Sequence, residues 1–357
     1  MHTYSLDEVL LKKEFLLVDV RSPEEYEEDT VLGAINMPIL DNEERKEVGY
    51  LYKQVDPFVA KRKGLEIASK KFLDYFDFVM ENKDKYKNVV FFCYRGGLRS
   101  QTVAKTLSLM GLKVGYLKGG YKNYRQHVLR ELPKATKKIE LLGLQGLTGV
   151  GKTKILCGLK EQNIPILDLE RYAQNSGSAF GSIVYAKGSY ISQKKFESNL
   201  YEAILKGGET TYYVECESKR IGRVVQPEYF YKKLKMASRV LIETEFSNRV
   251  QIIYDDYVRI GDEKNQELLL GAVKSLNKRL GNKVVDELCS YIEKDEQEKM
   301  IEVMLRDYYD PLYIHSIEED RPFIHEFKFD TIADAVEHLK EYWLENHKRE
   351  EVVDESN

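Results

Sequence analysis

Short apolar runs alternate with amphipathic stretches along the first third of the chain. Short apolar runs are typical of strands buried in a parallel sheet, and apolar residues three and four positions apart are typical of helices. The predicted strands are residues 15–19, 33–38, 89–93 and 113–117, and the predicted helices are residues 41–52, 67–83 and 101–110. Strands separated by helices imply a parallel sheet wrapped by helices, which is an α/β fold.

The same alternation starts again after a polar, lysine-rich joint at residues 133–138. Strands are predicted at residues 139–144, 165–169, 211–216, 239–243 and 324–329, and helices at residues 154–162, 248–257, 265–280, 286–307 and 332–347. The helices between the last two strands predict a helical insertion in a second α/β domain. We therefore expect domains at residues 1–132 and 137–347, followed by a disordered acidic tail at residues 348–357.

Composition narrows the class of protein without fixing its chemistry. Hydrophobic residues make up 43% and charged residues 32% of the 357 positions, as in soluble globular chains. No apolar run approaches the ~20 residues that span a bilayer, and the first residues lack a signal-peptide core, so a cytoplasmic protein is expected. The four cysteines are far apart and form no C-x-x-C pair, which argues against a disulfide framework or a zinc site.

Cys93 follows a predicted strand and begins a turn of unusual composition. Gly96 and Gly97 let the backbone fold into a cradle, while Arg95 and Arg99 add fixed positive charge. Backbone N–H groups and the start of the next helix would favour a thiolate or a bound oxyanion at this point. A buried structural cysteine is the ordinary alternative. We predict a reactive Cys93, because arginines and glycines occupy the same turn.

The second domain opens with an apolar strand that runs directly into the sequence GLTGVGKT, residues 146–153. G-x-x-x-x-G-K-T between a strand and a helix predicts a phosphate-binding loop for a di- or triphosphate. Its backbone N–H groups would cradle phosphate oxygens, Lys152 would balance their charge, and the Thr153 hydroxyl could hold Mg²⁺. The predicted phosphate-binding residues are Gly146, Thr148, Gly149, Gly151, Lys152 and Thr153.

Carboxylates that could stand beside such a metal ion are less clearly marked. Asp168 and the pair Glu215 and Glu217 each lie at a predicted strand end, where ligands bind in open α/β sheets. Arg220 follows the pair closely. These residues form either part of a second-domain site or a capped turn into a helix, and no metal site is certain.

Basic residues cluster near the predicted joint although the net charge is −4. That net charge argues against a chain coated with nucleic acid but leaves room for a local basic face. A solvated helix face is the ordinary interpretation of each cluster. The residues concerned are Lys118, Lys122, Arg125, Arg130, Lys137 and Lys138.

The stretch VDVRSPEEYEEDTVLGAINMP, the cysteine turn and VGYLKGGYKNYR together resemble a rhodanese (sulfurtransferase) domain. The resemblance implies that Cys93 carries a chalcogen as a persulfide and that the strand end at Asp19 and Arg21 supports the site. The spacing C-x5-R, from Cys93 to Arg99, is longer than in ordinary sulfurtransferases and is shared with a class of phosphatases. A wider cradle would suit ligands the size of phosphate or selenophosphate.

Residues 15–345 resemble the tRNA 2-selenouridine synthase family as a whole. The resemblance is carried by LDNEERKEVGYLYKQ (residues 40–54), CYRGGLRSQTVA, GGYKNYR, GLTGVGKT, LDLERYA, VECESKRIG and YDPLY (residues 309–313). One region departs: Asn175-Ser176-Gly177 stands where the family has a His-Arg-Gly stretch, and the glutamine-proline stretch before Tyr190 is missing.

The resemblance implies a transferase that acts on the wobble position 34 of tRNAs for Lys, Glu and Gln. The sulfur of 2-thiouridine is first geranylated from geranyl diphosphate, and selenium from selenophosphate then displaces geranyl thiol. Cys93 would receive selenium as S-selanylcysteine, with Arg95 and Arg99 orienting selenophosphate. The phosphate-binding loop would hold the diphosphate, and the basic residues of 118–138 would contact tRNA phosphates. A monomer without membrane contact is expected.

Three other functions remain open at this stage. A nucleotide-regulated rhodanese-type sulfurtransferase would hydrolyse ATP or GTP, and a C-x5-R phosphatase would use Cys93 to attack phosphorus. A binding module would keep Cys93 as a structural residue and sense nucleotide through the loop. None of the three requires both sites on one chain.

Overall fold

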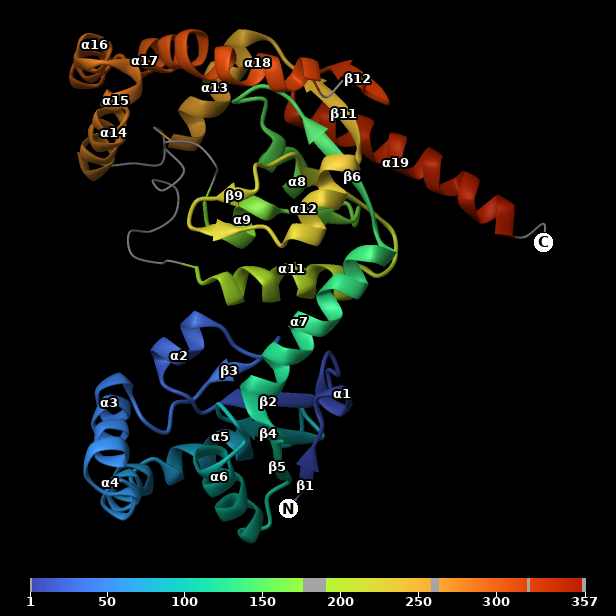
Figure 1. Ribbon diagram of the computed structural model, residues 1–357. Helices are drawn as coiled ribbons and strands as arrows, with labels where there is room; N and C mark the ends of the chain where they lie inside the picture. The colour runs from blue at the N-terminus through green and yellow to red at the C-terminus, as the bar shows by residue number, and fades with distance from the viewer. Residues whose placement is uncertain (1, 176–190, 258–262, 320–321, 355–357) are drawn as a thin grey trace. The chain divides into compact units, whose positions relative to one another are not determined.

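The computed structural model describes residues 2–175, 191–257, 263–319 and 322–354. The chain divides into two compact units, Met1–Leu132 and Pro133–Asn357 (Figure 1). Ser176, Gly177 and Tyr190, where the sequence departs from the resembled family, lie outside the described residues.

The first unit is built on a five-stranded sheet in the order β1-β5-β4-β2-β3, and every strand pair is parallel. Both faces are covered, so the residues of β2 and β4 are almost all buried. The strands are β1 (His2–Tyr4), β2 (Phe15–Asp19), β3 (Ile35–Asn36), β4 (Asn88–Phe92) and β5 (Val114–Leu117). The helices are α1 (Leu6–Val9), α2 (Pro23–Glu28), α3 (Asn42–Tyr50), the π-helix η1 (Leu51–Val55), α4 (Pro57–Ser69), α5 (Phe72–Asn82), α6 (Leu98–Leu109) and α7 (Gly120–Lys138).

The second unit has its own five-stranded parallel sheet, in the order β12-β11-β6-β8-β7. The strands are β6 (Glu140–Gln145), β7 (Ile166–Leu167), β8 (Thr211–Glu215), β11 (Ser238–Glu243) and β12 (His325–Lys328), with a separate antiparallel pair of β9 (Arg220–Ile221) and β10 (Val224–Val225). The helices that accompany the sheet are α8 (Lys152–Glu161), α9 (Leu169–Ala173), α11 (Gln193–Gly207), α12 (Glu228–Met236) and α19 (Ile332–Asp354). The predicted α/β fold is confirmed in both units.

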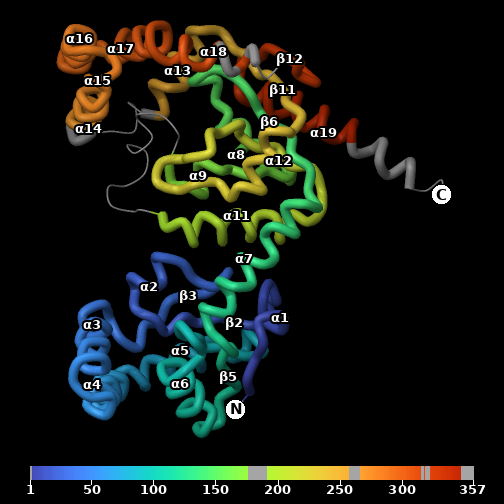
Figure 2. Tube along the Cα trace, in the orientation of Figure 1, coloured from blue at the N-terminus to red at the C-terminus, as the bar shows by residue number. Residues whose placement is uncertain are grey.

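A group of helices between β11 and β12 forms the predicted insertion. It gathers at one end of the second unit (Figure 2) and has a separate hydrophobic core that includes Val273, Leu288, Ile292 and Met304. Its members are α13 (Phe246–Tyr257), α14 (Glu263–Ser275), α15 (Asn277–Leu280), α16 (Asn282–Glu293), α17 (Gln297–Met304), the π-helix η2 (Leu305–Tyr309) and α18 (Asp310–Glu319).

The joint predicted at residues 133–138 belongs to helix α7, which continues through Pro133 to Lys138, and the chain divides into its two units between Leu132 and Pro133. Two local expectations differ from the structure. Helix α6 begins at Leu98 instead of residue 101, which places Arg99 and Ser100 in its first turn. Helix α19 continues past residue 348 to Asp354, into the segment that the sequence predicts to be disordered. Among the described helices, none is long and apolar enough to cross a membrane.

Candidate functional site

Cys93 stands at the carboxyl end of β4, and its side chain is 4% exposed. Its Sγ accepts hydrogen bonds from the Gly97 N–H and the Ser100 hydroxyl, both at 3.3 Å. Ser100 lies in the first turn of α6, so the positive end of the helix is directed at the sulfur. The reactivity of Cys93 stays a prediction, and Ser100 is a contact that the sequence did not predict.

The cysteine loop is packed so tightly that only glycine fits at two positions. Gly96 has φ +65°, and a Cβ there would lie 2.5 Å from the Leu117 carbonyl oxygen. Gly120 has φ +56°, and a Cβ there would lie 2.0 Å from the Cys93 carbonyl oxygen. The Tyr121 N–H donates to that same carbonyl at 3.0 Å. The start of α7 therefore holds the loop in place.

Arg99 is fixed by a carboxylate from α2. Its Nη1 and Nη2 donate to Glu25 at 2.7 and 3.3 Å, and Arg45 Nε lies 3.5 Å from the same carboxylate. Burial opposes the charge on Arg99, but the hydrogen bond and charge of Glu25 outweigh it and raise the pKa of the guanidinium. Burial likewise opposes ionisation of Glu25, whose pKa is nevertheless lowered by Arg99 and Arg45. Glu25 was missed by the sequence analysis, because it lies 74 residues before its partner.

The strand end expected to support the cysteine site forms a buried ionic cluster. Arg21 is 1% exposed and donates from Nη2 to Asp19 Oδ2 at 2.6 Å and to the Asp29 carbonyl at 2.6 Å. Its guanidinium lies 4.0 Å from the centroid of the Tyr121 ring. Since the Tyr121 backbone also contacts Cys93, this cluster joins β2 to the cysteine loop.

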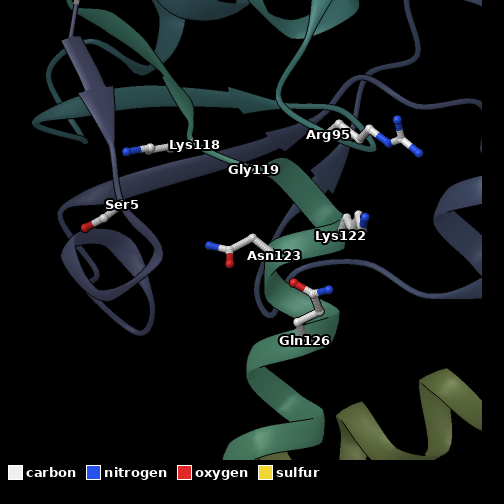
Figure 3. Close-up of a pocket in the computed structure, with 7 residues that line it drawn as sticks. All are labelled: Ser5, Arg95, Lys118, Gly119, Lys122, Asn123 and Gln126. Carbon is white, nitrogen blue, oxygen red and sulfur yellow. The ribbon is translucent and has the colours of Figure 1, made fainter.

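Arg95 points away from the buried side of the loop and lines a pocket of about 420 Å³ with Lys118 and Lys122 (Figure 3). The remaining lining residues are Ser5, Gly119, Asn123 and Gln126, and none of the lining residues is acidic. The two arginines predicted to act together therefore have different surroundings. Arg99 belongs to the Cys93 loop, and Arg95 belongs to a pocket with two of the predicted tRNA-binding lysines.

The other predicted tRNA-binding residues are divided between the units. Arg125 and Arg130 lie on α7 in the first unit, where Arg130 Nε donates to Glu131 at 2.6 Å. Lys137 and Lys138 end the same helix in the second unit, and Lys138 pairs with Glu209 at 2.5 Å. Arg130 and Lys138 thus already have carboxylate partners within the chain.

The phosphate-binding loop lies between β6 and α8, as its motif predicts. Gly149 and Gly151 have φ +84° and +78°, and a Cβ on Gly151 would lie 2.5 Å from Ile332 Cδ1. Lys152 Nζ donates to the Gly146 carbonyl at 2.9 Å. The glycines are required by both backbone conformation and packing.

Two carboxylates converge on Thr153 at the end of this loop. Its hydroxyl is 2.8 Å from Glu215 Oε1 and 3.1 Å from Glu170 Oε2. Burial, together with the charges of Glu170 and other carboxylates, raises the pKa of Glu215, which is 1% exposed. Burial and the charge of Glu217 raise the pKa of Glu170 to about 8. Burial also raises the pKa of Glu217, although Lys152 acts in the opposite direction.

The carboxylates that the sequence left as alternatives for the second-domain site have different roles in the structure. Asp168 accepts a hydrogen bond from the Arg171 N–H at 2.9 Å and caps α9. Glu215 contacts Thr153 directly, as does Glu170, which was not predicted. Arg220 is exposed in β9, and no hydrogen bond or ion pair of the described residues joins it to these carboxylates. Its predicted place in the site gains no support.

The helical insertion contacts the phosphate-binding loop through a buried ion pair. Arg249 of α13 donates from Nε to the Thr148 carbonyl at 2.8 Å, and its other two nitrogens bind Asp310 at 3.0 and 2.5 Å. Burial and the charges of Glu217 and Glu170 raise the pKa of Tyr313, one turn beyond Asp310 on α18. Helix α18 therefore faces the carboxylate group. The sequence marked residues 309–313 only as part of the resemblance, and it gave no sign of Arg249.

The donor set suits a hard cation that is shared with a phosphorylated ligand. Within the described ranges, no three His, Cys, Asp or Glu side chains converge as a preformed metal cage. Mg²⁺ usually takes one or two carboxylates together with substrate phosphates and water. Thr153 and Glu215 fit that kind of site, and a cation would favour the charged form of Glu215, whose pKa is raised by burial and by neighbouring carboxylates.

Two family profiles match the chain. A tRNA 2-selenouridine synthase AAA domain matches residues 139–347, and a rhodanese-like domain matches residues 4–127. A tRNA 2-selenouridine synthase from Shewanella pealeana is 32% identical to this chain, over 95% of this chain and 96% of its own length. The protein of that name from Bdellovibrio bacteriovorus is 30% identical, over 87% and 90%.

Among solved structures, similarity is found to the N-terminal domain of a putative ATP/GTP binding protein from Clostridium difficile. It is 41% identical to this chain and covers 36% of this chain and 99% of its own length, with a TM-score of 0.35. A rhodanese-related protein from Thermoplasma volcanium is 19% identical over 36% of this chain and 93% of its own, with a TM-score of 0.22.

Proposed function

The chain belongs to the tRNA 2-selenouridine synthase family, enzymes of tRNA modification that use a selenium donor, and we propose that it converts 2-thiouridine at wobble position 34 of tRNAs for Lys, Glu and Gln to 2-selenouridine. Geranyl diphosphate and selenophosphate are the proposed co-substrates. The observation that carries the proposal is one chain with a cysteine cradle built for an oxyanion and a phosphate-binding loop whose threonine contacts a buried carboxylate.

The proposed first step is geranylation of the tRNA at the phosphate-binding loop. The thiocarbonyl sulfur of the uridine attacks C1 of the geranyl group, the C1–O bond breaks, and diphosphate leaves with the electron pair. Backbone N–H groups of the loop and Lys152 would stabilise the charge that develops on the leaving oxygen. Thr153 and Glu215 would hold Mg²⁺, which neutralises diphosphate charge when it is bound.

The proposed second step takes place at the Cys93 loop, where N–H groups and Arg99 would hold selenophosphate. Formation of S-selanylcysteine requires the Cys93 thiolate to attack selenium, which breaks the Se–P bond and leaves phosphorus with the electron pair, as phosphite. Selenium then bonds to C2 of the uridine, and geranyl thiol departs. An external thiol must next attack the Cys93 sulfur, which breaks the S–Se bond, leaves the electron pair on the selenium of the product and leaves Cys93 as a mixed disulfide. If selenium instead passes directly from selenophosphate to C2, hydrolysis of the Se–P bond gives phosphate. The phosphorus product therefore distinguishes a covalent Cys93 carrier from a Cys93 that only positions the donor.

The proposed tRNA contacts begin with the pocket lined by Arg95, Lys118 and Lys122, which would take a backbone phosphate. Arg125, Arg130, Lys137 and Lys138 remain candidates for further phosphates, although the carboxylate partners of Arg130 and Lys138 would have to be displaced. A cytoplasmic monomer is the proposed form of the enzyme.

Mass spectrometry of nucleosides from a 2-thiouridine tRNA tests this function. Geranyl diphosphate alone should give the S-geranyl nucleoside, and both co-substrates together should give 2-selenouridine, with the phosphorus product measured in parallel. An unchanged tRNA would contradict the proposal. Hydrolysis of ATP or of an aryl phosphate under the same conditions would then favour the sulfurtransferase or the phosphatase.

A further inference from the structure

The first unit exposes an unusual group of apolar side chains away from the Cys93 loop. They lie at residues 50–62, where α3 passes through η1 and the chain turns back into α4 beside it (Figure 1). We call residues 50–62 the hairpin tip. The exposed fractions are 64% for Tyr50, 58% for Tyr52, 58% for Val55, 75% for Phe58 and 46% for Val59. Exposed apolar side chains that are grouped in this way are typical of interaction surfaces, whereas single exposed apolar residues are common everywhere on a protein.

The hairpin tip is held rigidly by its own backbone. Helix η1 ends where the Asp56 N–H donates to the Leu51 carbonyl at 3.0 Å, and π-helical turns often occur at functional sites. The Asp56 carboxylate caps α4 by accepting the N–H groups of Phe58 and Val59 at 2.7 and 3.0 Å. Phe58 therefore lies in the capped first turn of α4. Because the backbone there is already ordered, binding through the Phe58 ring costs little backbone entropy.

The charges of the hairpin tip favour an anionic partner. Lys53, Lys61 and Arg62 form no ion pair with a carboxylate in the described part of the chain, and Lys61 Nζ lies 4.8 Å from the centroid of the Phe58 ring. The negative charge of Asp56 is directed into the start of α4. A second copy of this surface would bring like charges together across a two-fold axis, which disfavours self-association.

Helix α3 connects the hairpin tip to a residue that contacts the cysteine site. Arg45, in the first half of α3, contacts the Glu25 carboxylate that binds Arg99. Tyr52 stands seven positions after Arg45, which corresponds to ~10 Å along a helix. A nucleic-acid loop with one base at Cys93 would thus have neighbouring bases near the hairpin tip.

We propose that the hairpin tip binds the unpaired bases of the tRNA anticodon loop, which stack on Tyr52 and Phe58 while Lys53, Lys61 and Arg62 contact the backbone. The inference rests on the proposed function, because it names the partner that the cysteine site would act on. Single-stranded nucleic acid is held by this combination of exposed aromatic rings and cations.

Binding of the full chain to a labelled anticodon stem-loop tests the proposal, with the closed stem alone as the comparison. Phe58→Ala and Tyr52→Ala should each weaken stem-loop binding by about 5- to 150-fold, the usual range for one stacked base, and should not affect binding of the stem. Phe58→Tyr and Tyr52→Phe should restore affinity, because they keep a ring. Leu109→Ala is the control, since Leu109 is 89% exposed elsewhere in the same unit.

Two further readouts separate stacking from charge and from catalysis. Lys53→Ala should lower the slope of log affinity against log salt by about 0.7, the value for one phosphate of a single strand, whereas Phe58→Ala should leave the slope unchanged. In selenouridine formation, Phe58→Ala should raise KM for tRNA and retain kcat.

Three results would overturn the inference. The alanine variants could bind the stem-loop as well as the wild type, they could lose the stem and the stem-loop equally, or Phe58→Ala could convert a wild-type dimer to a monomer in sedimentation. Failure of the proposed function is a separate result: the wild type would then form no 2-selenouridine, whatever the binding data show.

Discussion

The Cys93 loop and the phosphate-binding loop share one construction and differ in their charge balance. Each follows the carboxyl end of a parallel strand, uses glycines with positive φ, and leads into a helix. At the cysteine loop, Arg99 is matched by Glu25 within the chain. At the phosphate-binding loop, the pKa values of Glu170, Glu215 and Glu217 are all raised, chiefly by burial, and for Glu170 and Glu215 also by the charges of neighbouring carboxylates.

The comparison shows that two loops with the same backbone construction can differ in the ligands they suit, because the charged side chains around them differ. At the cysteine loop, the charge of Arg99 is already matched by Glu25, so the proposed anionic donor would bind without a further cation. At the phosphate-binding loop, the cation proposed to accompany the diphosphate would stabilise the charged form of the carboxylates. Three variants test this contrast and a fourth tests a histidine pair outside both loops; they follow in order of decreasing expected effect.

The largest effect is expected from Glu215→Gln. Loss of this charge beside Thr153 should reduce geranylation by about 100-fold or more, as does removal of one electrostatic group from a preorganised site. Asp168→Asn is the matched variant, because Asp168 caps α9 and does not contact Thr153. Asparagine caps a helix about as well as aspartate, so this variant should keep its stability and have a much smaller effect on rate. The measurement is the initial rate of S-geranyl nucleoside formation. An equal loss of rate in Glu215→Gln and Asp168→Asn would refute the role of Glu215 at the phosphate-binding loop.

A smaller effect is expected from Asp310→Asn, which removes the partner of buried Arg249. An uncompensated buried charge costs about 3 kcal/mol, so thermal unfolding of the second unit should shift downward. Geranylation should fall by about tenfold, because the Thr148 carbonyl loses a fixed contact. Lys340→Ala breaks an exposed pair with Glu337 and should change neither quantity appreciably. A normal rate and a normal melting curve for Asp310→Asn would contradict this role of the insertion.

Glu25→Gln should act on the first unit alone. Gln keeps one hydrogen bond to Arg99 but removes the paired charge, so Arg99 is held less firmly when selenophosphate binds. We expect KM for selenophosphate to rise about 3- to 10-fold with geranylated tRNA as substrate, from the loss of part of one charge-assisted interaction. The neighbouring Glu24→Gln is the control. A KM equal to that of the wild type would show that the ion pair does not position Arg99.

The smallest effect concerns a histidine pair away from both sites. His325 of β12 and His338 of α19 place their Nε2 atoms 2.7 Å apart, and burial together with His338 lowers the pKa of His325. A histidine with a lowered folded pKa contributes stability above its unfolded pKa, and this contribution is lost as pH falls below about 6.5. Thermal melts between pH 7.5 and 5.5 should show a decrease that is reduced in His325→Phe. An identical decrease in that variant would rule out the pair as its source.

The sequence predicted the features that lie within one continuous stretch. The strand-loop-helix order around Cys93 and around residues 146–153 depends on neighbouring residues, so both loops could be placed before the structure was known. Glu25, Glu170 and the Arg249–Asp310 pair could not be found in this way, because each acts on a residue from a distant element. The sequence placed the domain boundary near residues 133–138, but it did not show that these residues continue helix α7, because their polar composition suits a helix surface as well as a linker.

The separation of tasks between the two loops is the central claim, and nucleoside analysis of Cys93→Ser and Lys152→Ala tests it most directly. Each variant is given 2-thiouridine tRNA with both co-substrates, and S-geranyl tRNA with selenophosphate alone. Lys154→Ala is the control for Lys152, since Lys154 pairs with Asp256 outside the loop. Cys93→Ser should form the S-geranyl nucleoside but no 2-selenouridine, while Lys152→Ala should fail to geranylate yet convert S-geranyl tRNA. Loss of both reactions in both properly folded variants would contradict the account.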